Sequence, residues 1–149
     1  MTTPVSAQVT ADERFAVHDL LMTYVYAIDT GDAQGYAGTF KPDGVLITSE
    51  GERFAGRAAI LDYARRVVPK PGGRGRQHHF QQIRVSREGE GIRVFSFWMV
   101  AQRTSEPDAT RVRSIGSCDD LCVKTADGWR FAERKIGRWT DATAPWSGG

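Results

Sequence analysis

The sequence predicts an α+β domain in which three N-terminal helices pack inside a strongly curved, mostly antiparallel sheet, a cone-shaped α+β barrel. Apolar residues repeat at helical spacing in the first part of the chain, and long alternating segments fill the second half. Glycine-rich turns separate these segments. The chain has 149 residues, the size of one domain. We expect a single domain over 1–149, with a loose leader at 1–9 and a tail at 141–149.

The first helix is expected over 11–29. Thr10 and Glu13 form a capping box, in which each side chain bonds the other residue's backbone amide. Gly31 ends the helix, because glycine readily adopts the left-handed conformation that follows a helix terminus. The apolar residues recur at three- and four-residue steps: Phe15, Val17, Leu20, Leu21, Tyr24, Val25 and Ile28.

Two shorter helices are expected after it. Asp32 is placed to cap a second helix that carries Tyr36 and Phe40. Gly56 opens a third helix over 57–68, whose apolar residues again follow helical spacing. The glycine- and proline-rich stretch after it reads as a lid or a surface loop.

The remaining elements are strands joined by tight turns. A turn at 41–44 precedes a strand at 45–48, which pairs with 53–55 in a hairpin. Four longer strands follow, at 77–87, 91–104, 110–124 and 129–140. Residues 92–101 are apolar on both faces, so both faces should be covered. We expect the helices on one face and a partner subunit on the other, in a homodimer or higher homo-oligomer.

Composition excludes several classes of protein. With 40% hydrophobic residues the chain is not intrinsically disordered. It lacks an apolar run of about 18 residues, so no membrane association is expected. A net charge of +2 is too small to indicate nucleic-acid binding. The N-terminus does not resemble a secretion signal, which predicts a cytoplasmic protein.

The cysteines and the basic residues give weaker information. Cys118 and Cys122 lie about 13 Å apart on a strand, too far for a disulfide, and are expected to be free thiols. Basic residues gather near the third helix and its following loop, at Arg65, Arg66, Lys70, Arg74 and Arg76. They form either a solvated surface or a site that attracts anionic ligands.

A carboxylate and two histidines are the first candidates for chemistry. Asp29 ends the first helix, as a solvated helix end or as a functional acid. His78 and His79 begin a strand, so one of them must face inward, in a structural or a functional role. Strand alternation does not decide between them, because Phe80 shares a face with His78 whereas the apolar residues after it share a face with His79. A β-bulge would reconcile both patterns.

Arg134 and several aromatic residues complete the candidates. Arg134 on the last strand is either a surface residue paired with Glu133 or Asp119, or a cation that stabilises a substrate oxyanion. The aromatic residues belong to the core, or bind a ligand at the mouth of the cone, and they are Tyr24, Tyr26, Tyr63, Trp98 and Trp139.

An aspartate and a histidine together in an apolar pocket form a general-base unit. The sequence lacks GxSxG, Walker, dinucleotide-binding and HExxH patterns, so simple proton transfer is the chemistry that remains. Elimination, isomerisation, cyclisation and water addition are all compatible with this chemistry. Neither a metal nor a cofactor is expected.

The sequence resembles the SnoaL-like family of the nuclear-transport-factor-2-like superfamily, over about residues 11–138. The resemblance rests on these positions: Leu21, Tyr24, Asp29, Gly31 and Asp32; Phe40, Pro42, Asp43, Gly44 and Val45; Gly56, Arg57, Ala59 and Ile60; His78, Gln82 and Val85; and Asp127 to Phe131 with Glu133 and Arg134. Gln82 stands where the family usually has asparagine.

This resemblance implies a cofactor-free lyase or isomerase, similar to scytalone dehydratase, bile-acid 7α-dehydratase and hexachlorocyclohexane dehydrochlorinase. It implies Asp29 and His78 as the catalytic dyad, with Tyr24 and Arg134 as further catalytic residues. The expected substrate is a small hydrophobic cyclic molecule, contacted by Tyr26, Tyr63, His79, Trp98 and Trp139. The alternatives are a non-catalytic small subunit, a ligand-binding module of the same fold, or a polyketide cyclase.

Overall fold

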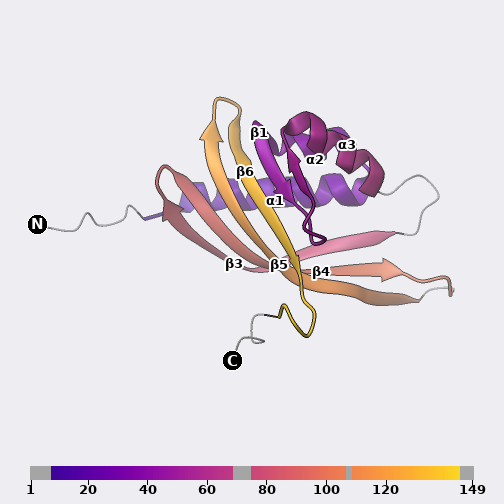
Figure 1. The fold of residues 1–149 in the computed structure, drawn as a ribbon. Coiled ribbons are helices and arrows are strands. Elements are labelled where there is room, and N and C mark those ends of the chain that lie inside the picture. Colours follow the sequence, from indigo (N-terminus) through magenta and orange to yellow (C-terminus); the bar gives the residue numbers. More distant parts are fainter. Residues whose placement is uncertain (1–7, 69–74, 107–108, 145–149) are drawn as a thin grey trace, which may run out of the picture.

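One six-stranded sheet curves around three helices in the computed structural model of the chain (Figure 1). The structure describes residues 8–68, 75–106 and 109–144. The helices are α1 (Ala11–Thr30), α2 (Ala33–Gly38) and α3 (Arg57–Val67). The strands are β1 (Phe40–Ile47), β2 (Arg53–Ala55), β3 (Arg76–Glu88), β4 (Gly91–Arg103), β5 (Thr110–Thr125) and β6 (Gly128–Arg138).

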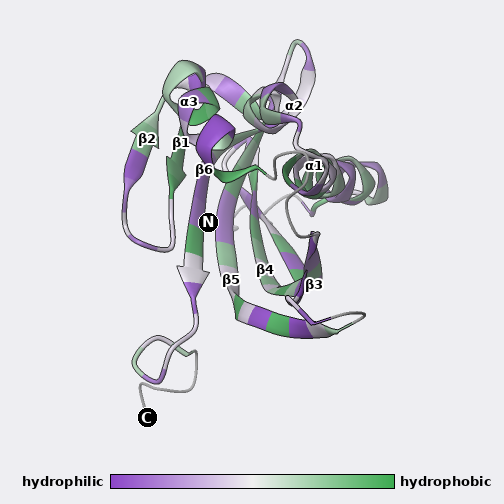
Figure 2. Ribbon diagram, turned by 90° about the vertical axis from the view of Figure 1, so that its right-hand side faces the viewer, coloured by the Kyte–Doolittle hydropathy of each residue, from purple (hydrophilic) through white to green (hydrophobic). Residues whose placement is uncertain are grey.

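The strand order is β2-β1-β6-β5-β4-β3, and every neighbouring pair is antiparallel except β1 and β6. Figure 2 shows the helices on the concave side of this sheet. The sheet remains open, with β2 and β3 as its edges. The predicted α+β class, with three N-terminal helices inside a curved, mostly antiparallel sheet, is confirmed.

Helix α1 has the ends that its sequence predicts. The Thr10 hydroxyl accepts from the Glu13 amide at 3.2 Å, and the Glu13 carboxylate accepts from the Thr10 amide at 2.9 Å. Gly31 adopts the left-handed conformation, with a φ of 85°. This cap fixes where α1 stops, and therefore where Asp29 in its last turn lies.

The core lies between the helices and the concave face of the sheet. Its centre is an aromatic cluster in which Tyr24, Tyr36, Phe40 and Phe131 pack with ring centroids 4.6–6.4 Å apart. A second cluster, formed by Trp98, Val100 and Cys118, lies farther along the strands. Cys118 and Cys122 are buried free thiols, as expected.

The segment after α2 differs from its prediction. Phe40 begins β1 instead of ending the second helix, and the residues at 41–44 belong to that strand instead of forming a separate turn. The cause is tertiary: Phe40 pairs with Phe131 of β6, and the register then shifts before Val45. The turn predicted at 41–44 is therefore wrong: the turn-forming residues lie at an irregularity within the strand.

Several expectations fall outside the described residues. They concern most of the leader, the greater part of the loop at 69–75 with Lys70 and Arg74, and the end of the tail. Within the described ranges, none of the helices combines the length and the apolar character needed to cross a membrane. On the convex face of the sheet, Phe95, Val112 and Ile115 expose 37%, 58% and 41% of their surface. The expected partner subunit on this face remains a prediction.

Candidate active site

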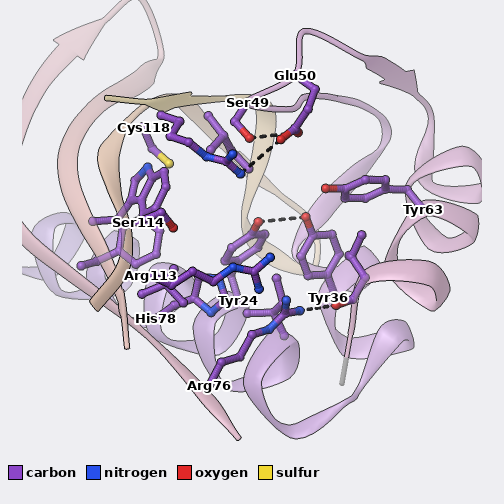
Figure 3. A pocket seen from close by; sticks show the side chains of 17 residues that line it. Tyr24, Tyr36, Ser49, Glu50, Tyr63, Arg76, His78, Arg113, Ser114 and Cys118 are labelled. Carbon is purple, nitrogen blue, oxygen red and sulfur yellow. Dashed lines mark hydrogen bonds and ion pairs between the residues drawn. The ribbon is translucent and has the colours of Figure 1, made fainter. Parts of the chain in front are cut away.

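A cavity of about 250 Å³ opens between the helices and the concave face of the sheet. Figure 3 shows its lining side chains, which come from α1, α2, α3, β3, β4, β5, β6 and the turn after β1. Phe80, Trp98, Val100 and Ile136 form much of its apolar wall. Tyrosines, arginines and His78 add polar groups, so the cavity combines the shape and the chemistry of a small-molecule site.

Asp29 and His78 meet at this cavity, although 49 positions separate them in the sequence. His78 Nδ1 lies 2.6 Å from Asp29 Oδ1, and the His78 backbone N–H donates to Asp29 Oδ2 at 2.7 Å. Their side chains are 16% and 15% exposed. Asp29 therefore fixes both the backbone and the ring of His78. A carboxylate acceptor favours the tautomer in which Nδ1–H donates to Asp29, and this leaves the other ring nitrogen, Nε2, to exchange a proton with a ligand.

A β-bulge decides which of the two histidines faces the cavity. The β3–β4 register shifts between Gln81 and Arg84, and Gln82 has a φ of 45°. Before the bulge, His78 lines the cavity and His79 is exposed. After it, the alternation is reversed, so the apolar residues of the second half of β3 also face inward.

Tyr24 and Tyr36 place two phenols on the cavity wall. Their hydroxyl oxygens form a hydrogen bond of 2.8 Å, marked in Figure 3. Burial raises the pKa of Tyr24 to about 12, despite the opposing charge of Arg134. Burial also raises the pKa of Tyr36 well above its usual value. Both phenols are therefore neutral at ordinary pH, and whichever of them accepts in the shared hydrogen bond keeps its own O–H to donate to a ligand. The sequence analysis had placed Tyr36 on a helix without assigning it to the site.

Arg134 has a different place from either prediction. It is fully buried and donates to Asp120 Oδ2 at 2.8 Å, because the two residues are register partners on β5 and β6. The expected surface partners, Glu133 and Asp119, are not the ones it uses. Arg134 does not line the cavity. Its guanidinium carbon lies 4.1 Å from the centroid of the Tyr24 ring, so it supports that ring from behind.

The predicted ligand-contacting residues divide into two groups. Tyr63 and Trp98 line the cavity. Tyr26, His79 and Trp139 do not: Tyr26 is 73% exposed, and Trp139 packs on Phe97 with ring centroids 4.7 Å apart. Two of these positions follow from local geometry, since Tyr26 lies off the apolar stripe of α1 and His79 alternates with His78.

Three arginines also line the cavity, and only Arg76 was named in advance, within the basic cluster expected either to be solvated or to attract anionic ligands. The three are Arg76, Arg113 and Arg138. Alternation along β3 places Arg76 on the same face as His78, a signal that was available. No such signal exists for Arg113, because its orientation depends on a β-bulge in the pairing of β4 with β5.

Solved structures with this fold come from several bacteria. ActVI-ORFA from Streptomyces coelicolor is 21% identical, with a TM-score of 0.78 over 86% of this chain and 98% of that one. A Catenulispora acidiphila protein in complex with S-DNPA is 24% identical, with a TM-score of 0.75 over 87% and 95%. A protein provisionally named a scytalone dehydratase, from Novosphingobium aromaticivorans, is 20% identical, with a TM-score of 0.72 over 87% and 85%.

These likenesses establish the fold. No curated protein matches the sequence significantly. The family is shown by a match between residues 9–135 and the SnoaL-like domain. The range includes α1, all six strands almost to the end of β6, and both members of the Asp29–His78 pair. The chain therefore belongs to the family of SnoaL-like domains.

Proposed function

We propose that this protein is a cofactor-free lyase or isomerase that uses His78 as a general base on a small, hydrophobic, cyclic substrate. The observation that carries the proposal is the double contact of Asp29 with the backbone and ring of His78 at a cavity with a partly apolar wall. A positioned histidine of this kind typically accelerates proton transfer by about 10²- to 10⁴-fold.

Dehydration of a β-hydroxy ketone illustrates the proposed chemistry. His78 Nε2 takes the proton from the carbon between the carbonyl and the hydroxyl-bearing carbon. The electrons of that C–H bond form the new C=C bond, and the C–O bond to the hydroxyl breaks. The departing hydroxide takes that proton back from His78 Nε2 and leaves as water, which returns the imidazole to its neutral form. Tyr24 donates a hydrogen bond to the carbonyl oxygen while negative charge develops on it.

Two comparisons support a reaction of this class. The SnoaL-like family assignment fits a small-molecule site in this cavity. One structural neighbour is provisionally named a scytalone dehydratase, and another was solved with the small molecule S-DNPA. The alternative in which the domain binds a ligand without turnover is also supported by the aromatic lining, and the experiment below separates the two.

The test uses 3-hydroxy-1-tetralone, a bicyclic β-hydroxy ketone that loses water to give 1-naphthol, followed by absorbance and by mass spectrometry. We expect formation of 1-naphthol by the wild type and its loss in His78→Gln and Asp29→Asn. His79→Gln is the matched control, since it makes the same change in the adjacent exposed histidine. Undiminished turnover in His78→Gln would contradict the mechanism. Saturable binding with no turnover of this substrate or of related cyclic β-hydroxy ketones would favour the ligand-binding module.

We also propose a homodimer formed through the convex face of the sheet. Phe95, Val112 and Ile115 expose apolar surface there, beside the edge-to-face pair Phe97 and Trp139. Sedimentation equilibrium should give twice the chain mass for the wild type. Ile115→Asp should shift the protein to the monomer, and a wild-type monomer at micromolar concentration would refute the proposal.

A further inference from the structure

We propose that the substrate carries a carboxylate, held by Arg76 and Arg113 at one side of the cavity. This inference rests on the proposed function, because it names the substrate class of the same site. In Figure 3 the side chains of Arg76, Arg113 and His78 extend into the same part of the cavity. An anion bound by the arginines would therefore place the rest of the substrate beside the general base.

Arg76 reaches the cavity from β3, two residues before His78 and on the same face of the strand. Two residues span about 7 Å along a strand. Its guanidinium donates to the carbonyl of Val67, which fixes one end of the group. Its Nε is buried and has no hydrogen-bond partner in the described part of the protein. Burial and the nearby charge of Arg113 lower the pKa of Arg76, as expected for a cation that lacks a counterion.

Arg113 enters the cavity because of a β-bulge in β5. Val100 of β4 pairs with Ser114, whereas the next residue, Ala101, pairs with Val112. Arg113 is the extra residue between these pairs, so it lines the cavity together with its neighbour Ser114. In a regular strand, two consecutive residues would face opposite sides of the sheet. Bulges commonly redirect a side chain in this way beside an active site.

In the described ranges, neither arginine has a carboxylate partner of its own. Among the residues that the structure describes, Arg76 and Arg113 form no ion pair. The third cavity arginine, Arg138, is neutralised by Glu50 at 3.2 Å. Asp29 is near enough to attract the charge of Arg76, but both carboxylate oxygens of Asp29 already form hydrogen bonds with His78. Two like charges that repel each other remain, and an anionic ligand would relieve this repulsion.

A carboxylate fits the site better than a larger anion. Its two oxygens match the fork of one guanidinium, and the second arginine can share them. The remaining wall near His78 is apolar, with Phe80 and Val100 among its residues. We therefore infer that the substrate is a cyclic, hydrophobic carboxylic acid. Its carboxylate binds the arginines, and its reacting C–H bond belongs to the ring part that lies beside His78.

The experiment measures binding without turnover. The probes are 2-naphthylacetic acid and its uncharged amide of nearly the same shape, titrated by calorimetry at low ionic strength. We expect the wild type to bind the acid roughly tenfold more tightly than the amide, the size of a charged hydrogen bond. Arg113→Gln should remove this preference, and Arg113→Lys should keep part of it. Arg84→Gln, which removes an exposed arginine from the same strand as Arg76, should leave the preference unchanged.

Three results would overturn the carboxylate site: equal affinity for acid and amide in the wild type, an unchanged preference in Arg113→Gln, or tighter binding of 2-naphthyl phosphate than of the acid. Circular dichroism confirms that each variant is folded. Dehydration of the uncharged tetralone without any preference for the acid would refute this inference and leave the proposed function intact. A preference for the acid in a wild type that dehydrates neither the tetralone nor related cyclic hydroxy acids would refute the function and leave the anion site intact.

Discussion

Two acid–base pairs lie in the same molecule and differ in what surrounds them. Asp29 and His78 meet at the edge of the cavity, where each side chain keeps about one sixth of its surface exposed. Asp120 and Arg134 meet inside the layer between sheet and helices, where neither is exposed. Both pairs are close, at 2.6 and 2.8 Å between the nearest atoms.

The comparison shows that a short contact between an acid and a base does not by itself mark a catalytic pair. Arg134 lies against the Tyr24 ring and is not among the residues that line the cavity, so we propose that its pair with Asp120 supports the wall. Burial raises the pKa of Asp120 although the charge of Arg134 opposes the rise, so a charge on this carboxyl is costly in that place. His78 instead presents a ring to the cavity, where Nε2 can meet a ligand.

The largest expected effect comes from breaking the buried pair. Asp120→Ala leaves the Arg134 guanidinium buried without its counterion, and such changes typically cost about 3–5 kcal/mol of stability. Urea denaturation followed by circular dichroism measures the loss. The double variant Asp120→Leu with Arg134→Met removes both charges and should recover most of it. A loss below about 1 kcal/mol in Asp120→Ala would contradict the structural role.

A smaller effect on stability is expected at the cavity pair. Asp29→Asn keeps an oxygen that can accept from the His78 amide, so stability should fall by only about 1 kcal/mol. The tautomer of the neutral His78 ring should change more clearly, because an amide can donate as well as accept and so no longer favours Nδ1–H specifically. Nitrogen NMR of the ring reads this directly: the wild type at neutral pH should show the Nδ1–H form. An Nε2–H form in the wild type would contradict the assignment.

The two buried phenols predict sensitivity to alkali. A phenol whose pKa is higher in the folded chain than its unfolded value of about 10 stabilises the fold fully below that pH. For Tyr24 this contribution is lost as the pH rises towards about 12. Stability should therefore decline from about pH 10 upwards, and Tyr36→Phe should decline less steeply. Equal slopes in the two proteins, measured by urea denaturation at several pH values, would contradict this.

The smallest effect is expected at Tyr26, on the solvent-exposed side of α1, the helix that also carries Tyr24. Tyr26→Ala should change stability by no more than about 0.5 kcal/mol and should leave turnover of the tetralone unchanged. Thermal unfolding and initial rates measure the two quantities. Loss of turnover in this variant would contradict this expectation and indicate that Tyr26 contacts the substrate, as the sequence analysis predicts.

Much of the fold could be predicted because its signals are local. The capping box at Thr10 and Glu13, the left-handed Gly31 and the hairpin between β1 and β2 depend on residues near one another in the sequence. The contact between Asp29 and His78 was expected from the resemblance to the SnoaL-like family, and the structure brings these residues together. The alternation of apolar residues within β3 did not decide which of the two histidines, His78 or His79, faces inward.

What could not be predicted depends on pairing between distant strands. The partner of Arg134 is set by the β5–β6 register, which puts Asp120 opposite it instead of the neighbouring Asp119. Arg113 faces the cavity only because β5 contains an extra residue opposite β4. A shift of one position in register or alternation moves a side chain to the other face of a sheet, and single-strand patterns do not reveal it.

The sequence by itself determined the helix that ends beside Asp29 and the alternating strands that supply the cavity wall, because helix caps and two-residue periodicity act over a few neighbouring positions. Only the tertiary structure decided that His78 faces inward, that Arg134 is sealed in the core and that Arg113 reaches the cavity. Each of these outcomes follows from a register or a bulge, and those are fixed by the packing of whole strands against one another.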